Sequence, residues 1–388
     1  MSDTPDEKNR IISAVGAPRM LLGYNYTWGF DKFGWYFGPH WRPGDAVDPD
    51  QGKTYEEIFH DEQDPQKRER GPEPWQENWL TCLPRNLELL KSKWDIRIIR
   101  IFLLCNAQNL GTSNNSARTW AFARTLHPRF LRHLQTLFDT VRQKEMKVIP
   151  SILDFGVADP VHRWEKRHHI VTDPAMRSTF VEQIVTPFAQ LGKSYRDVIY
   201  AWEVMNEPSW MNAAIWPNHT VRVPAASVKE INAFLGAVLE RIKREDPQAK
   251  TTVGHRYYRD LDTYETGDLK QFHYYPSYYR GLGGVLDIVP LTDPERLPVV
   301  YRESPKPILG EIGATAHQGE PWLELDDKDI GSARNRIRER LLQAERKGYA
   351  LTLIWPDMDW NKDTSDDHLK LSPSAQQGLD DFKARPKP

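Results

Sequence analysis

The sequence contains little cysteine and no apolar run long enough to cross a membrane. Only Cys82 and Cys105 occur in 388 residues, which excludes a disulfide framework. No run approaches the roughly 18 apolar residues of a membrane span, and the polar N-terminus lacks the apolar core of a signal peptide. Positive charge is not in excess, because 52 Lys and Arg stand against 54 Asp and Glu. We therefore expect a cytoplasmic protein that binds neither membranes nor nucleic acid, with a secreted protein whose signal peptide has been removed as the alternative.

Internal repeats, low-complexity linkers and a glycine-rich phosphate loop after the first apolar run are also missing. Their absence favours one domain over residues 1–388 and weakens a nucleotide-binding interpretation. Tryptophan, in contrast, is abundant, with 14 residues, and proline reaches 29. Such a chain either stacks its rings in a large core or presents flat rings to a ligand.

Eight short apolar runs alternate with longer amphipathic stretches, as buried parallel strands and their covering helices do. The runs cover residues 20–24, 97–103, 147–153, 198–204, 251–254, 271–274, 307–312 and 350–355. Helical spacing of apolar residues is clearest over 130–141, 228–242 and 337–344. Eight strand–helix units predict an α/β fold, a (β/α)8 TIM barrel, more than an open sheet.

Two segments depart from a minimal barrel. Residues 28–75 form a long insertion after strand one, and we expect them to lie as a loop or lid over the active face. The connection between strands five and six is too short for a full helix, so we expect an irregular turn around residues 259–264.

Catalytic groups of TIM barrels lie at the C-terminal ends of the strands, where this sequence places two carboxylates. Strand four leads into Asn206-Glu207-Pro208, and strand seven ends at Glu311. Alone, Asn206 and Pro208 could begin a helix, and Glu311 could form a structural ion pair. Together, on strands four and seven, Glu207 and Glu311 can enter one cleft. Two carboxyls about 5–5.5 Å apart are what a retaining glycosidase uses, one as acid/base and one as nucleophile.

The strand-four run Trp202-Glu203-Val204-Met205-Asn206-Glu207-Pro208 resembles the signature of clan A glycoside hydrolases, most closely in the style of glycoside hydrolase family 5, the cellulase and mannanase family. The order of strand-end residues extends this resemblance over residues 20–360. It implies a (β/α)8 fold, Glu207 as acid/base and Glu311 as nucleophile. It also implies substrate-site roles for Arg100 on strand two, His273 and Tyr275 on strand six, and Trp355 on strand eight.

One position departs from the family pattern. The family often carries a histidine near the end of strand three, where this chain has Asp154, and we expect Asp154 to contact the substrate instead. This difference leaves another clan A family open.

The expected chemistry explains each residue type. Glu311 must be ionised, and Arg100 and Tyr275 would favour that form. Glu207 must hold a proton, so partial burial and the charge of Glu311 should raise its pKa. Asn206 is placed to bond the sugar 2-hydroxyl, a contact that strengthens in the transition state.

Aromatic residues near strand ends are candidates for stacking on the apolar faces of a sugar. Trp28 and Trp35 lie in the loop after strand one, with Trp41 nearby, and Trp210 and Trp216 follow Glu207. The loop rings could equally form a small core of their own. Past strand eight, Asp357, Asp359 and Trp360 are polar-rim candidates.

We predict no metal and no cofactor, because His168-His169 lacks the spacing of a zinc site. The function expected is a retaining β-glycoside hydrolase that acts on β-linked oligosaccharides or glycosides. A sugar-binding protein without turnover and a transglycosylase on the same barrel are the alternatives, and a metal-dependent amidohydrolase is disfavoured because strand one lacks His-x-His. The sugar, endo or exo action and oligomeric state are left open.

Overall fold

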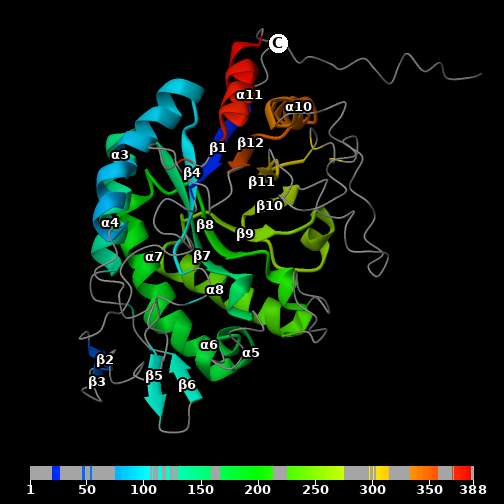
Figure 1. The fold of residues 1–388 in the computed structure, drawn as a ribbon. Helices are drawn as coiled ribbons and strands as arrows, with labels where there is room; N and C mark the ends of the chain where they lie inside the picture. The colour runs from blue at the N-terminus through cyan, green and yellow to red at the C-terminus, as the bar shows by residue number, and fades with distance from the viewer. Residues whose placement is uncertain are drawn as a thin grey trace, which may run out of the picture.

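The computed structural model describes residues 20–26, 46–48, 53–54, 75–104, 107, 112–115, 119–122, 126, 130–158, 167–212, 225–274, 297, 300, 303–313, 333–356, 369 and 371–385. Eight parallel strands close into a barrel in the order β1-β12-β11-β10-β9-β8-β7-β4 (Figure 1). The predicted (β/α)8 TIM barrel is therefore confirmed. The barrel strands are β1 (Leu21–Asn25), β4 (Ile98–Phe102), β7 (Lys147–Asp154), β8 (Trp202–Asn206), β9 (Thr251–His255), β10 (Leu269–Tyr274), β11 (Ile308–Gly313) and β12 (Leu351–Trp355).

Helices surround the barrel in the described ranges (Figure 1). The α-helices are α3 (Trp75–Trp94), α4 (Phe130–Gln143), α5 (His169–Thr172), α6 (Pro174–Phe180), α7 (Thr186–Gly192), α8 (Val228–Glu245), α10 (Ala333–Arg346) and α11 (Pro373–Ala384). A π-helical turn, η4 (Val181–Val185), joins α6 to α7, and 3₁₀ turns occur at η2 (Phe155–Ala158), η5 (Lys193–Tyr195), η6 (Pro208–Asn212) and η7 (Tyr258–Asp262). No described helix combines the length and apolar character needed to cross a bilayer.

Most expected strands agree closely with the structure, but strand four begins later than predicted. Val198 and Ile199 both donate their backbone N–H to the carbonyl of Tyr195, so they complete a turn and do not extend the strand. Ile199 forms only an isolated bridge to Val148, and β8 starts at Trp202. The short connection between strands five and six is the turn η7, as predicted.

Helix α8 illustrates how local sequence defines a covering helix. Ser227 accepts a hydrogen bond from the backbone of Glu230, whose side chain bonds back to Ser227, a capping box that satisfies orphan N–H groups. The buried residues recur at helical spacing and face the barrel: Ile231, Phe234, Leu235, Val238 and Ile242.

The barrel interior changes from apolar to polar along its axis. Five aliphatic side chains from β4, β7, β11 and β12 form a small cluster of their own: Ile98, Ile149, Ile308, Leu351 and Leu353. Further along β4 comes the fully buried Arg100. Most of the insertion 28–75 lies outside the described residues. The exceptions are the short strand pair β2 (Ala46–Asp48) and β3 (Lys53–Thr54) and residue 75, which begins α3. A second pair, β5 (Thr112–Asn115) and β6 (Thr119–Phe122), precedes α4. The single-domain organisation of residues 1–388 stays a prediction.

Candidate active site

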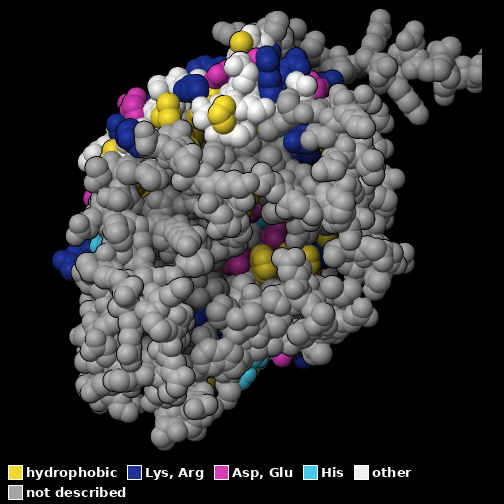
Figure 2. Space-filling model, in the orientation of Figure 1, with side chains coloured by type: hydrophobic (Ala, Val, Ile, Leu, Met, Phe, Trp, Pro, Cys, Tyr) yellow, Lys and Arg dark blue, Asp and Glu magenta, His cyan; other side chains and the backbone are white. Residues whose placement is uncertain are grey.

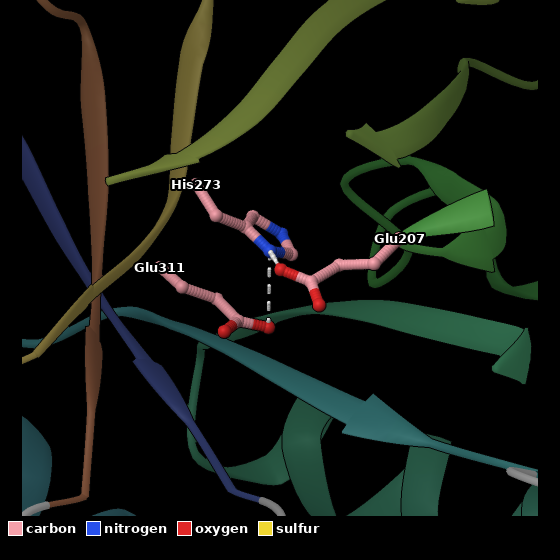
Figure 3. Close-up of side chains that lie close together, drawn as sticks. All are labelled: Glu207, His273 and Glu311. Atoms are coloured by element: carbon pink, nitrogen blue, oxygen red, sulfur yellow. Dashed lines mark hydrogen bonds and ion pairs between the residues drawn. The ribbon is translucent and has the colours of Figure 1, made fainter. Parts of the chain in front are cut away.

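Glu207, His273 and Glu311 meet at the C-terminal ends of β8, β10 and β11 (Figure 3). His273 Nδ1 lies 2.8 Å from Glu207 Oε1 and 3.5 Å from Glu311 Oε1. One oxygen of each carboxyl and the imidazole nitrogen all lie within 4.8 Å of one another. The two glutamates on strands four and seven are therefore brought together, with the predicted His273 between them.

Glu207 has an unusual backbone conformation. Its φ angle is 45°, in the left-handed region that a non-glycine residue rarely adopts. The backbone N–H of Glu207 donates to the carbonyl of Gly254 on β9 at 2.6 Å, which anchors this bend. A residue held in a sparsely populated conformation at the end of a strand is typical of functional sites, where strain fixes the direction of a side chain.

Arg100 is fully buried and connects four side chains of the site. Its Nε and Nη2 donate to the two oxygens of Glu203, both at 2.6 Å. Its Nη1 donates to Glu311 Oε1 at 2.7 Å and to Asn25 Oδ1 at 2.9 Å. Nη2 also donates to Asn206 Oδ1 at 2.6 Å. The guanidinium thus holds one oxygen of Glu311 in place and supplies positive charge beside it.

Glu203 is the main partner of Arg100, although no role was predicted for it from the sequence. Ser151 donates to its Oε1 at 2.8 Å, and Gln271 donates to its Oε2 at 2.6 Å. Burial opposes its ionisation, but Arg100 outweighs this and lowers the pKa of Glu203. A Cβ on Gly254 would lie 2.8 Å from Glu203 Oε1, so only glycine leaves room for the ion pair.

Asn206 and Asp154 form the side of the site next to β7. Asn206 Nδ2 donates to Asp154 Oδ2 at 2.7 Å, and Asn206 Oδ1 accepts from Arg100. These two contacts fix the orientation of the amide and leave one Nδ2 hydrogen for another acceptor. Asp154 Oδ1 accepts from the backbone of Gly156 at 2.7 Å. Asp154, which stands where the family often has histidine, is 2% exposed.

Burial shifts the pKa of three groups in this site. Desolvation raises the pKa of Glu207 to about 7, with a smaller contribution from Asp260, while Arg256, Trp210 and Arg100 act in the opposite direction. Burial was the expected cause, but the charge expected from Glu311 is not among the main contributions. Desolvation also raises the pKa of Asp154 to about 7 and lowers that of His273 to about 4. At neutral pH the imidazole is therefore neutral, and Glu207 is poised to gain or lose a proton.

Two of the expected aromatic residues are described, and they differ in exposure. Trp355, at the end of β12, is partly exposed and lies edge-on to Phe102 with centroids 6.3 Å apart. Trp210 is 3% exposed, so it does not present a face for sugar stacking. Its indole N–H instead donates to Glu207 Oε2 at 2.8 Å. The remaining candidates lie outside the described residues: Trp28, Trp35, Trp41, Trp216, Tyr275, Asp357, Asp359 and Trp360.

Sequence reasoning missed the polar residues beneath the carboxylate pair. Asn25, Ser151, Glu203 and Gln271 are each 0% exposed and contact Arg100 or its partner. A signal was present, because polar residues within largely apolar strands are costly to bury unless they bond one another. Their partners lie on different strands, and for this reason the contacts are not readable along the chain.

Glu207, His273 and Glu311 also satisfy the spacing of three ligands to one metal ion. The prediction that no metal is required therefore needs a direct test. The contacts themselves have another explanation, since His273 Nδ1 is at hydrogen-bond distance from Glu207. Figure 2 shows acidic and hydrophobic side chains together in the middle of one face of the molecule.

Known proteins resemble this chain in fold more than in sequence. No protein-family model matches the chain, and no curated protein matches it. Solved structures do match over most of the chain. A β-mannanase from the blue mussel Mytilus edulis is 14% identical, with 93% of this chain and 92% of that chain covered and a TM-score of 0.56. A β-1,4-mannanase from the sea hare Aplysia kurodai is 14% identical, with 95% and 94% covered and a TM-score of 0.57.

A third structure is a single-residue variant of GH5_18 from Streptomyces cattleya in complex with Manβ1-4GlcNAc. It is 15% identical, covers 94% of this chain and 80% of that chain, and has a TM-score of 0.56. At these identities the likeness establishes the fold, a (β/α)8 barrel of the kind that these mannanases and the GH5_18 enzyme share. The resemblance to glycoside hydrolase family 5 expected from strand four is confirmed at this level.

Proposed function

We propose that the protein is a retaining β-glycoside hydrolase of the clan A, family 5 type that acts on β-linked oligosaccharides or glycosides. One observation carries the proposal: Glu207 and Glu311 project from β8 and β11 with carboxyl oxygens within 4.8 Å. Inverting enzymes hold their carboxyls about 6.5–9.5 Å apart to leave room for water, whereas retaining enzymes hold them about 5–5.5 Å apart. The short separation favours double displacement.

In this mechanism Glu311 is the nucleophile. An oxygen of Glu311 bonds to the anomeric carbon as the bond from that carbon to the leaving oxygen breaks, and the electron pair goes to that oxygen. Arg100 bonds Glu311 Oε1 at 2.7 Å, which orients the carboxylate and places a positive charge beside it. Because Arg100 is itself held by Glu203, the carboxylate is positioned before substrate arrives.

Glu207 acts as the acid and then as the base. With a pKa of about 7 it holds a proton at mildly acidic pH and donates it to the leaving oxygen. In the second step Glu207, now ionised, removes a proton from water as the water oxygen bonds to the anomeric carbon. The bond from that carbon to Glu311 breaks, and its electron pair returns to the Glu311 carboxylate. Asn206 has one amide hydrogen left for the sugar 2-hydroxyl. No cofactor takes part in these steps.

The neighbouring structures guide the choice of substrate. Two are β-mannanases, and the third was determined with Manβ1-4GlcNAc. We therefore propose β-mannosidic oligosaccharides and glycosides as the first substrates to examine, with β-glucosides as the comparison.

A screen over aryl β-glycosides and β-linked oligosaccharides tests the proposal. We expect hydrolysis of at least one β-glycoside, with the β-anomer of the product appearing first in proton NMR, and no loss of activity with a chelator present. Initial formation of the α-anomer would contradict retention. Calorimetric binding across the panel without turnover would favour a sugar-binding protein instead, and longer products would indicate transglycosylation. Activity that a chelator abolishes would show that the three-ligand group holds a metal.

The pH dependence follows from Glu207. For a glycoside with a poor leaving group, we expect kcat/KM to fall as pH rises through about 7, because the required proton is lost from Glu207. Asp154 has a pKa of about 7 as well, so the variant Asp154→Asn is the necessary control. The alkaline limb should persist in Asp154→Asn, and its disappearance would assign the limb to Asp154.

A further inference from the structure

Trp210 lies three residues after Glu207, in the 3₁₀ turn η6, and its indole contacts the acid/base directly. The N–H donates to Glu207 Oε2 at 2.8 Å, while Oε1 faces His273 Nδ1 at 2.8 Å. The two oxygens of Glu207 are therefore held by different partners. Trp210 is 3% exposed, and its role follows from this bond and not from stacking on a ligand.

The ring of Trp210 is held from a second loop. The guanidinium of Arg256, which follows β9, lies 3.9 Å from the Trp210 ring centroid and 4.1 Å from that of Tyr257. Next to Trp210, Ser209 donates to Asp260 of η7 at 2.7 Å. Two contacts of different kinds thus join η6 to the loop that contains η7, and they fix the indole relative to the barrel.

An indole can only donate, and this restricts where Glu207 can carry its proton. An N–H bonds better to the carbonyl oxygen of a carboxylic acid than to its hydroxyl oxygen. With His273 in the tautomer whose Nδ1 has no hydrogen, so that Nδ1 accepts at Oε1, the Trp210 contact favours Oε2 as the carbonyl oxygen and Oε1 as the protonated one. Oε1 is the oxygen on the side of His273, whose Nδ1 lies 3.5 Å from Glu311 Oε1, so this choice directs the proton toward the space between the two carboxyls.

We propose that Trp210, clamped by Arg256, is a positioning residue that keeps the transferable proton of Glu207 on Oε1, facing the bond to be cleaved. This inference rests on the proposed glycosidase function. In the step concerned, the proton leaves Oε1 for the glycosidic oxygen, that oxygen takes the electron pair of the broken bond, and Glu311 bonds to the anomeric carbon. Oε2 accepts from the indole throughout.

The electrostatics agree with the geometry. Arg256 and the Trp210 hydrogen bond both lower the pKa of Glu207 against the larger effect of burial. In the described part of the chain, the charged or titratable groups that contact or interact with Glu207 or its bonded partners are Arg100, Asp154, Glu203, His255, Arg256, Asp260, His273 and Glu311. Removing the donor or the positive charge should therefore make Glu207 harder to ionise and move the alkaline limb of the pH profile to higher pH.

The test uses leaving groups that differ in their need for an acid. In Trp210→Phe, kcat/KM for a phenyl β-glycoside should fall about 10- to 100-fold, because proton donation is misdirected. For the 2,4-dinitrophenyl glycoside, which departs without a proton, it should change less than about threefold. Arg256→Met should show the same pattern to a smaller extent with the alkaline limb raised, whereas Arg256→Lys should keep the limb near its wild-type position.

Phe155→Leu is the packing control, because Phe155 contacts the Trp210 ring with centroids 6.0 Å apart and bonds neither carboxyl. Phe155→Leu should change kcat/KM for the phenyl and the 2,4-dinitrophenyl glycoside by the same factor. Equal losses on both glycosides in Trp210→Phe, or no loss on either, would overturn the proposal. If Trp210→Phe does not fold, as judged by circular dichroism, the comparison of Arg256→Met with Arg256→Lys tests the proposal instead. A wild-type protein inactive on every glycoside would refute the proposed function itself. Leaving-group dependence in Trp210→Phe equal to that of the wild type would refute only the positioning role of Trp210.

Discussion

Replacing Glu311 with alanine should lower kcat on an aryl β-glycoside roughly 10⁵-fold, the scale of the advantage that a well-placed nucleophile gives. Glu311 is 3% exposed and held at Oε1 by Arg100 at the end of β11, and alanine leaves no carboxylate at that position. Steady-state kinetics with a dinitrophenyl glycoside would measure the loss.

Azide then distinguishes the roles of the two carboxylates. In Glu311→Ala the anion should enter the space left by the carboxylate and attack the same face of the sugar, which yields the α-glycosyl azide. In Glu207→Ala the glycosyl–Glu311 intermediate still forms, so azide should attack from the other face and yield the β-glycosyl azide. The opposite pair of products would exchange the assignments.

A carboxylate outside the site provides the control for these variants. Glu303 bonds Tyr258 and lies near Lys270, away from the carboxylate pair. Glu303→Ala should keep kcat within about threefold of the wild type, within the usual range of surface substitutions. Full activity in Glu311→Ala would refute the nucleophile assignment.

Replacing Arg100 with methionine should destabilise the fold by about 3–5 kcal/mol, the usual effect of removing one partner of a buried ion pair. Both Arg100 and Glu203 have side chains that are 0% exposed, and the loss of the guanidinium leaves Glu203 and Glu311 without their counter-charge. Urea denaturation followed by circular dichroism would measure the change in the free energy of unfolding.

Arg97, which lies just before β4, offers a matched control for Arg100. It pairs with Asp95 at the surface, where the side chains are 50% and 58% exposed. Arg97→Met should cost less than about 1 kcal/mol. The double variant Arg100→Met with Glu203→Leu should recover part of the loss, because it removes the unpaired charge. A cost for Arg100→Met no greater than that for Arg97→Met would contradict the expected role of the network.

The strands were predictable because each is short, buried on both faces and bounded by polar residues. Strand four was the exception at its start, where Val198 and Ile199 are apolar but complete a turn closed by Tyr195. Apolar composition shows that residues are buried, but it does not distinguish the last turn before a strand from the strand itself.

The proximity of Glu207 and Glu311 was predictable for a different reason. Both follow apolar runs, and the ends of parallel strands in a barrel converge on one face. The resemblance to a family implied that Arg100 lies in the substrate site, and the structure shows Arg100 bonded to Glu311. The shift in the pKa of Glu207 was only half predicted. Burial was expected, but Asp260, which raises this pKa, and Arg256, which lowers it, belong to a connection without a recognisable motif.

The sequence by itself determined the number and order of the strands, the class of fold and the two carboxylates at strand ends. These depend on periodicity and chain order, which can be read along the chain. The tertiary structure alone decided that Glu203 supports Arg100, that Arg256 holds the indole which bonds Glu207, and that Asp260, in place of Glu311, adds to the raised pKa of Glu207. The physical reason is that these effects need side chains from separate strands and loops, which meet only when the barrel closes, as Arg100 and Glu203 do at a separation of 103 residues.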